Sequence, residues 1–144
     1  MNDVLQAGQE GGPPFRRTPD GATTVPSFED HVDYADPPIQ PVLRKLRAGI
    51  IGLGRMREKV TPARRIAYEN ERDFCEVKIQ KKRVLVRVFN TGLPDPKGIV
   101  TDIPKSHGWQ YEKEIPIASL QLIDYVMPFI EASYRSSRAK MPRR

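Results

Sequence analysis

Cysteine, histidine and tryptophan are scarce in this sequence of 144 residues, which holds one cysteine, two histidines and one tryptophan. A single cysteine excludes a disulfide within the chain, and neither histidine has a second ligand at the spacing of a metal site. Cys75 falls on the apolar positions of a strand pattern, which indicates a buried thiol rather than a reactive one. We therefore expect no metal site, no cofactor and no cysteine chemistry.

The sequence also lacks the long apolar segments that a membrane-spanning helix or a signal peptide requires. No run approaches the roughly 20 apolar residues of a membrane-spanning helix. The first residues have neither the basic start nor the apolar core of a signal peptide. These absences predict a cytoplasmic protein without membrane contact. The hydrophobic content of 38% is still enough for one modest core.

The stretch FCEVKIQKKRVLVRVF, residues 74–89, is the pattern around which the chain is organised. Apolar side chains alternate along both halves, which predicts two antiparallel strands joined by a loose loop over residues 80–83. Further strands are expected at 66–69 and 111–117, and helices at 42–53 and 120–134, where apolar residues recur at helical spacing. The expected fold class is α+β: a small two-layer domain whose antiparallel sheet has about four strands and is flanked by two helices.

The remaining segments show less periodicity. Residues 1–27 are rich in Gly, Pro and charge and predict a disordered arm, residues 28–136 form a single domain, and residues 137–144 predict a basic flexible tail. Residues 55–65 read as a basic connection broken by Pro62, and residues 90–109 as a long irregular crossing. Pro128 predicts a kink or a break in the last helix.

The order of several motifs resembles one bacterial family. These motifs are FEDH at 28–31, LRKLRAGIIGLG at 43–54, RRIAYENERDFCEVKIQKKRVLVRVF at 64–89, DPKG at 95–98, GW at 108–109 and IASLQLIDYVMPFIEASY at 117–134. Over about residues 28–136 they resemble the DUF5655-type domain, often labelled "predicted transport protein". The resemblance implies a domain found alone or at the C-terminal end of larger proteins, some with nuclease or restriction-type partners. It implies no accepted catalytic motif.

Charge is distributed unevenly along the chain. Residues 1–36 hold seven acids against two arginines, a net charge of −5, although the whole chain carries +6. A basic body and tail favour polyanion binding, with the acidic arm as a competitor. We expect a non-catalytic module that binds nucleic acid nonspecifically through phosphate contacts, or binds a protein that processes nucleic acid. The expected contact residues are Lys81, Lys82, Arg83, Arg64, Arg65, Arg138 and Lys140.

Three alternatives stay open. Glu76 and Lys78 have the Glu-x-Lys spacing of restriction-type nucleases, in which the acid binds magnesium and the lysine stabilises the attacked phosphate. A purely structural interaction domain is the second alternative, and it would dimerise through the sheet face bearing Leu85 and Phe89. A small-ligand pocket is the third, if the long crossing folds over the sheet and brings together Tyr68, Asp95, His107 and Trp109.

Overall fold

One antiparallel sheet of six strands forms the base of the fold, in the order β2-β3-β4-β5-β7-β6. The computed structural model describes the backbone of residues 26–140 and the side chains as far as Ser137. The expected hairpin is confirmed: β4 and β5 are the central pair, and a hydrogen bond from the Gln80 amide to the Arg83 carbonyl (3.0 Å) closes their four-residue loop. The strands are β2 (Arg57–Thr61), β3 (Arg65–Glu69), β4 (Asp73–Ile79), β5 (Val84–Val88), β6 (Thr101–Asp102) and β7 (Lys113–Ile117).

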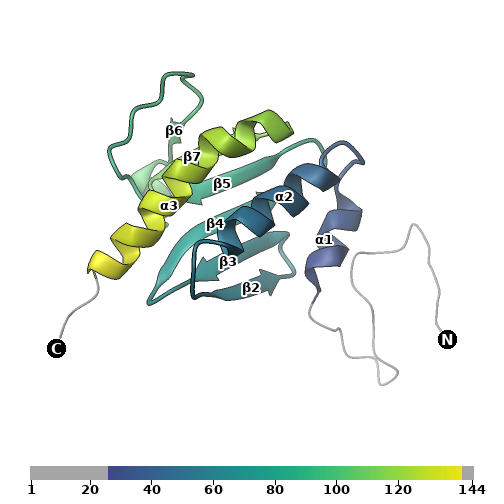
Figure 1. Cartoon of the computed structure of the whole chain (residues 1–144), viewed down its shortest axis with the longest axis horizontal. Coiled ribbons are helices and arrows are strands. Elements are labelled where there is room, and N and C mark those ends of the chain that lie inside the picture. The colour runs from purple at the N-terminus through teal and green to yellow at the C-terminus, as the bar shows by residue number, and fades with distance from the viewer. Residues whose placement is uncertain (1–25, 141–144) are drawn as a thin grey trace.

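Three α-helices complete the domain. In Figure 1, α2 and α3 lie across one face of the sheet and α1 lies beside α2. None of these α-helices covers the opposite face, which we call the outer face. Two layers result, and the expected α+β class is confirmed. The helices are α1 (Phe28–Tyr34), α2 (Gln40–Ile51) and α3 (Ile123–Lys140), with short 3-10 turns η1 (Lys105–His107) and η2 (Leu120–Leu122).

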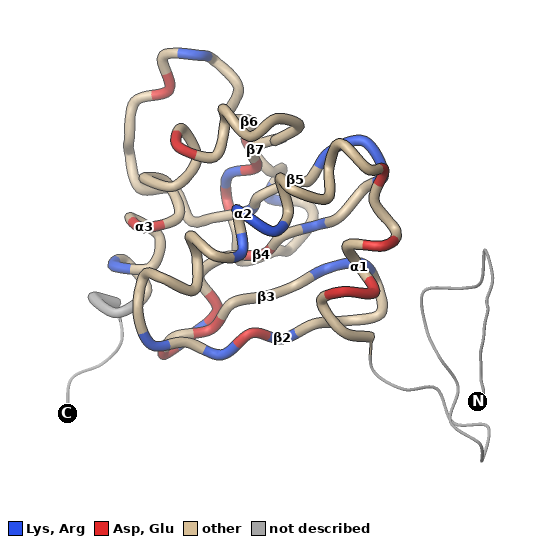
Figure 2. The backbone as a smooth tube through the Cα atoms, turned by 45° about the vertical axis from the view of Figure 1, so that its right-hand side comes forward, with Lys and Arg blue, Asp and Glu red and all other residues tan. Residues whose placement is uncertain are grey.

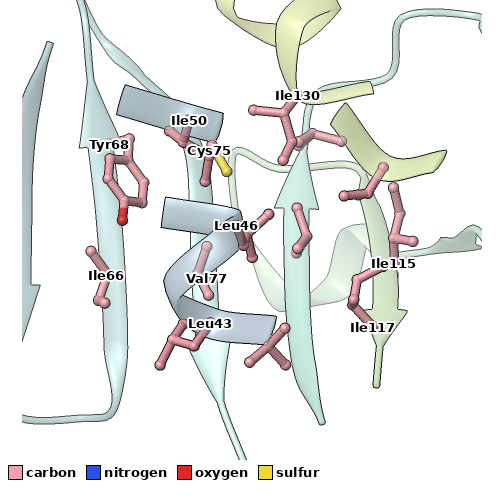
Figure 3. Close-up of a cluster of buried hydrophobic side chains, with 14 of the residues drawn as sticks. Leu43, Leu46, Ile50, Ile66, Tyr68, Cys75, Val77, Ile115, Ile117 and Ile130 are labelled. Atoms are coloured by element: carbon pink, nitrogen blue, oxygen red, sulfur yellow. The ribbon is translucent and has the colours of Figure 1, made fainter. Parts of the chain in front are cut away.

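The core lies between the helices and the inner face of the sheet. Alternation along β3, β4, β5 and β7 turns every second side chain toward the helices, and apolar residues occupy almost all of these positions. Ile123 and Val126 of α3 are buried there, as expected. Figure 3 shows the cluster, in which the labelled residues are Leu43, Leu46 and Ile50 of α2, Ile66 and Tyr68 of β3, Cys75 and Val77 of β4, Ile115 and Ile117 of β7, and Ile130 of α3.

The expected number of strands, about four, was too low. β2 occupies residues that were expected to form a basic connection, and β6 lies within the long crossing. β2 has one apolar residue, Val60, on its inner face, so its sequence shows no alternation of apolar and polar residues. Its backbone pairs antiparallel with β3, and ion pairs support its position: Arg57 pairs with Glu69 of β3, and Lys59 binds Asp73 of β4 at 2.7 Å.

The helix boundaries also differ from expectation. Residues 28–34 form a further helix, α1, whose N-cap is a capping box in which Ser27 and Asp30 exchange hydrogen bonds. α3 begins after η2 and continues through Pro128 to Lys140, into the segment expected to be a flexible tail. Packing of its apolar stripe on β4 keeps the helix intact although Pro128 has no amide to donate. Residues 1–25 and 141–144 of the expected arm and tail lie outside the described residues.

Candidate nucleic-acid interface

The strand register gathers basic side chains at one end of the sheet. Arg65 of β3 lies opposite Lys78 of β4, and the Ile79 amide donates to the Arg64 carbonyl at 2.8 Å. The turn at residues 62–64 and the hairpin loop at residues 80–83 therefore leave the sheet side by side, and Figure 2 shows Lys and Arg on both connections beside α1. We call this group the basic end; it consists of Arg64, Arg65, Lys78, Lys81, Lys82 and Arg83.

Tyr34, the last residue of α1, links the two basic turns. Its ring lies 3.5 Å from the guanidinium carbon of Arg64 and 4.6 Å from the Lys81 ammonium nitrogen. Both contacts are cation–π interactions, which hold the two cations near each other despite their repulsion. The Asp36 amide also donates to the Lys81 carbonyl at 2.9 Å. Sequence reasoning missed Tyr34, because nothing near it in the chain indicates contact with two later turns.

His31 fixes α1 against the same end of the sheet. Its Nε2 lies 2.8 Å from the Thr61 carbonyl oxygen, which accepts only, so this nitrogen carries the proton. Burial lowers the pKa of His31, and its Nδ1 is buried without a hydrogen-bond partner in the described part of the chain. A neutral imidazole is therefore the form that suits this position. His31 is a positioning residue for the basic end.

The cations of the basic end are only partly neutralised. Lys82 forms an ion pair with Asp36 at 2.9 Å, and no other salt bridge to the group occurs within the described residues. Arg64 keeps one buried guanidinium nitrogen, Nη1, without a hydrogen-bond partner among them. Burial, and next the charge of Arg65, lower the pKa of Lys78. An anion placed beside Lys78 would relieve its repulsion from Arg65.

Two expected contact residues cannot be assigned to the interface. The backbone of Arg138 and Lys140 belongs to α3, but their side chains lie outside the described residues. α3 starts near the basic end, since β7 ends opposite the beginning of β5, and it runs toward the other end of the sheet. The helix therefore carries its last turns away from the hairpin loop.

The structure brings together only half of the expected pocket. His107 and Trp109 lie edge to face with ring centroids 4.7 Å apart. Tyr68 is buried in the core, where its hydroxyl donates to Glu58 at 2.8 Å and burial raises its pKa. Asp95 accepts hydrogen bonds within its own loop, from the amides of residues 99 and 100, and from the Tyr125 hydroxyl. Among the described residues, neither Tyr68 nor Asp95 contacts the His107–Trp109 pair.

A hollow of about 850 Å³ lies at the end of the sheet opposite the basic end. Gly54 at its wall has a φ of +151°, and a Cβ there would lie 2.5 Å from the Tyr134 hydroxyl oxygen, so this close approach requires glycine. The charged residues that line the hollow are of both signs, and Arg57 and Glu69 neutralise each other as an ion pair. The hollow is lined by Leu53, Gly54, Arg55, Met56, Arg57, Glu69, Asn70, Glu71 and Tyr134.

Glu76 and Lys78 point to the outer face and each has a protein partner. Glu76 forms an ion pair with Arg87 at 2.9 Å, and the Lys78 ammonium donates to the Ala63 carbonyl at 3.0 Å. In the described range, no three His, Cys, Asp or Glu side chains are grouped so that they could hold a metal ion. Burial raises the pKa of the Cys75 thiol, as its place in the core requires.

Across residues 26–140, no helix is both long and apolar enough to span a bilayer. No solved structure matches the chain.

Relatives of the chain carry little functional information. An uncharacterized protein of Haemophilus influenzae is 26% identical over 109 residues, which make up 74% of this chain and 36% of that protein. The chain thus spans little more than a third of the length of this curated relative. Residues 28–137 match the family described as "Domain of unknown function (DUF5655)", and this range includes all six strands, α1, α2 and α3 as far as Ser137. The chain therefore belongs to the DUF5655 family.

Proposed function

We propose that this chain is a non-catalytic binding module that contacts nucleic-acid phosphates through the basic end. The observation that carries the proposal is the convergence of two basic turns, separate in sequence, around Tyr34. Clustered Lys and Arg side chains bind a phosphate backbone with release of its counterions, whatever the base sequence.

The anchoring of the cluster supports this proposal further. Contacts with Tyr34 and the hydrogen bond between Asp36 and Lys81 hold both turns before any ligand arrives. Side chains that are already ordered lose less conformational entropy on binding. Asp36 weakens phosphate binding, because its ion pair with Lys82 must break before Lys82 can contact a phosphate. The acidic arm inferred from the sequence would act in the same direction.

The salt dependence of binding tests this function. We expect purified protein to bind a fluorescently labelled oligonucleotide, with the dissociation constant measured by anisotropy. If about four phosphates are contacted, affinity should fall about 100-fold between about 50 and 200 mM salt, because each contact contributes close to one unit of log-log slope. A complex that is insensitive to salt, or no complex at low salt, would contradict the proposal and favour a protein partner.

A further inference from the structure

Trp109 is an exposed aromatic side chain on the outer face of the sheet. It is the sole tryptophan of the sequence, and 42% of its surface remains exposed. Its ring lies 4.5 Å from the guanidinium carbon of Arg87, and His107 packs edge to face against it. One side of the indole is therefore held by the protein, while much of the remainder faces solvent.

The support beneath Trp109 is rigid. Arg87 extends from the central strand β5, and only 8% of its side chain is exposed. Its guanidinium donates to Glu76 of β4 at 2.9 Å and to Glu114 of β7 at 2.8 Å, and these hydrogen bonds outweigh burial and raise the pKa of Arg87. Two carboxylates face this one cation, a local net charge of −1, so the place where Trp109 rests has no surplus positive charge for a phosphate.

Two residues of the basic end, Arg65 and Lys78, lie on the outer face one row away from Arg87. On the outer face the row next to the hairpin loop consists of Arg65, Lys78, Leu85 and Pro116, with no carboxylate. Arg87 belongs to the following row, since it lies two residues beyond Leu85 on β5. The spacing of strands and residues puts the backbone of Lys78 roughly 8 Å from that of Arg87. Lys78 therefore lies on the strand next to Arg87, one outer-face row from the side chain on which Trp109 rests.

We propose that the nucleic acid held at the basic end is single-stranded, and that one of its bases stacks on the exposed side of Trp109. This inference rests on the proposed function. Bases in a duplex are already stacked on both sides and paired, whereas an unpaired base can place its face on an aromatic side chain. The outer face offers the two parts that such binding needs: an exposed indole held by Arg87, and the cations Arg65 and Lys78 one row away for the backbone.

Tryptophan fluorescence and a matched pair of variants test the inference. Titration with an unlabelled single-stranded oligonucleotide should quench Trp109, and the same length of duplex should not. Trp109→Ala should bind a labelled single strand about 10-fold or more weakly, with duplex affinity unchanged. Trp109→Phe should retain part of the affinity. Leu93→Ala, which removes a comparably exposed apolar side chain from the same long connection, should bind as the wild type does.

The possible results distinguish failure of base stacking on Trp109 from failure of phosphate binding at the basic end. Salt-dependent binding that is equal for single strand and duplex, and unchanged in Trp109→Ala, would overturn base stacking while the basic end keeps its role. Quenching without a loss of affinity in Trp109→Ala would also overturn it, because the indole would then be a bystander. Absence of binding to any oligonucleotide would remove the function and the inference together.

Discussion

Replacing Ile123 by aspartate is expected to leave the protein unfolded. Ile123 is the first residue of α3 and is 2% exposed, packed in the core between the helices and the sheet. The substitution removes a large apolar side chain and places an unpaired carboxylate in the core, which together destabilise by about 5 kcal/mol or more. That is comparable with the whole stability of a small domain, about 5–15 kcal/mol. Circular dichroism and thermal melting would show the loss of a cooperative transition.

Leu120→Asp is the matched control for this substitution. Leu120 lies three residues earlier, in η2, but is 44% exposed, so aspartate there remains solvated. We expect this control to melt cooperatively and close to the wild type. A soluble Ile123→Asp protein that melts in the same way would show that the start of α3 is not part of the core.

The second large effect concerns the hairpin loop. The triple variant Lys81→Ala, Lys82→Ala, Arg83→Ala should bind oligonucleotides about 10- to 100-fold more weakly at low salt, and its log-log salt slope should fall by about three. All three side chains are exposed, so little stability should be lost, which melting would verify. Anisotropy across a salt series measures both the affinity and the slope.

Two variants show whether position or charge alone decides the result. The first is a triple variant that removes the same charge at the opposite end of the sheet: Arg55→Ala, Arg57→Ala, Arg135→Ala. We expect its affinity for the oligonucleotide to stay within about 3-fold of the wild type. Asp36→Asn should act in the opposite direction and strengthen binding, because it frees Lys82 from its ion pair. Equal losses in both triple variants would mean that net charge, rather than the basic end, governs binding.

The central hairpin could be predicted from the sequence because each of its strands shows the alternation on its own. Val77, Ile79, Val84 and Val86 all face the helices, and no information from elsewhere in the chain is needed to see this. β2 could not be predicted in the same way. Its charged residues are matched by Glu69 and Asp73 on two other strands, so its stabilising partners are visible only once the strands are paired.

The candidate site, too, could be predicted from the sequence only in part. Five of the six cations of the basic end were expected contacts, all but Lys78, but composition alone does not show which of them meet. Strand register places Arg64 beside Lys81, and α1 then adds Tyr34 from a distant segment. The His107 and Trp109 rings are in contact and are close in sequence, whereas Tyr68 is turned into the core by its position on the inner face of β3. The sequence pattern predicts contacts between residues close in the chain, whereas contacts between distant segments depend on how the strands and helices pack.

Backbone amide chemical shifts, followed by NMR while an oligonucleotide is added to isotopically labelled protein, show directly where nucleic acid binds. We predict saturable shifts at Arg64, Lys78 and the loop at residues 80–83, with the amides around Gly54 and Glu71 at the opposite end unchanged. The shifts should diminish when salt is raised. Shifts concentrated at the opposite end, or none at the hairpin loop under conditions where binding occurs, would contradict a role for the basic end.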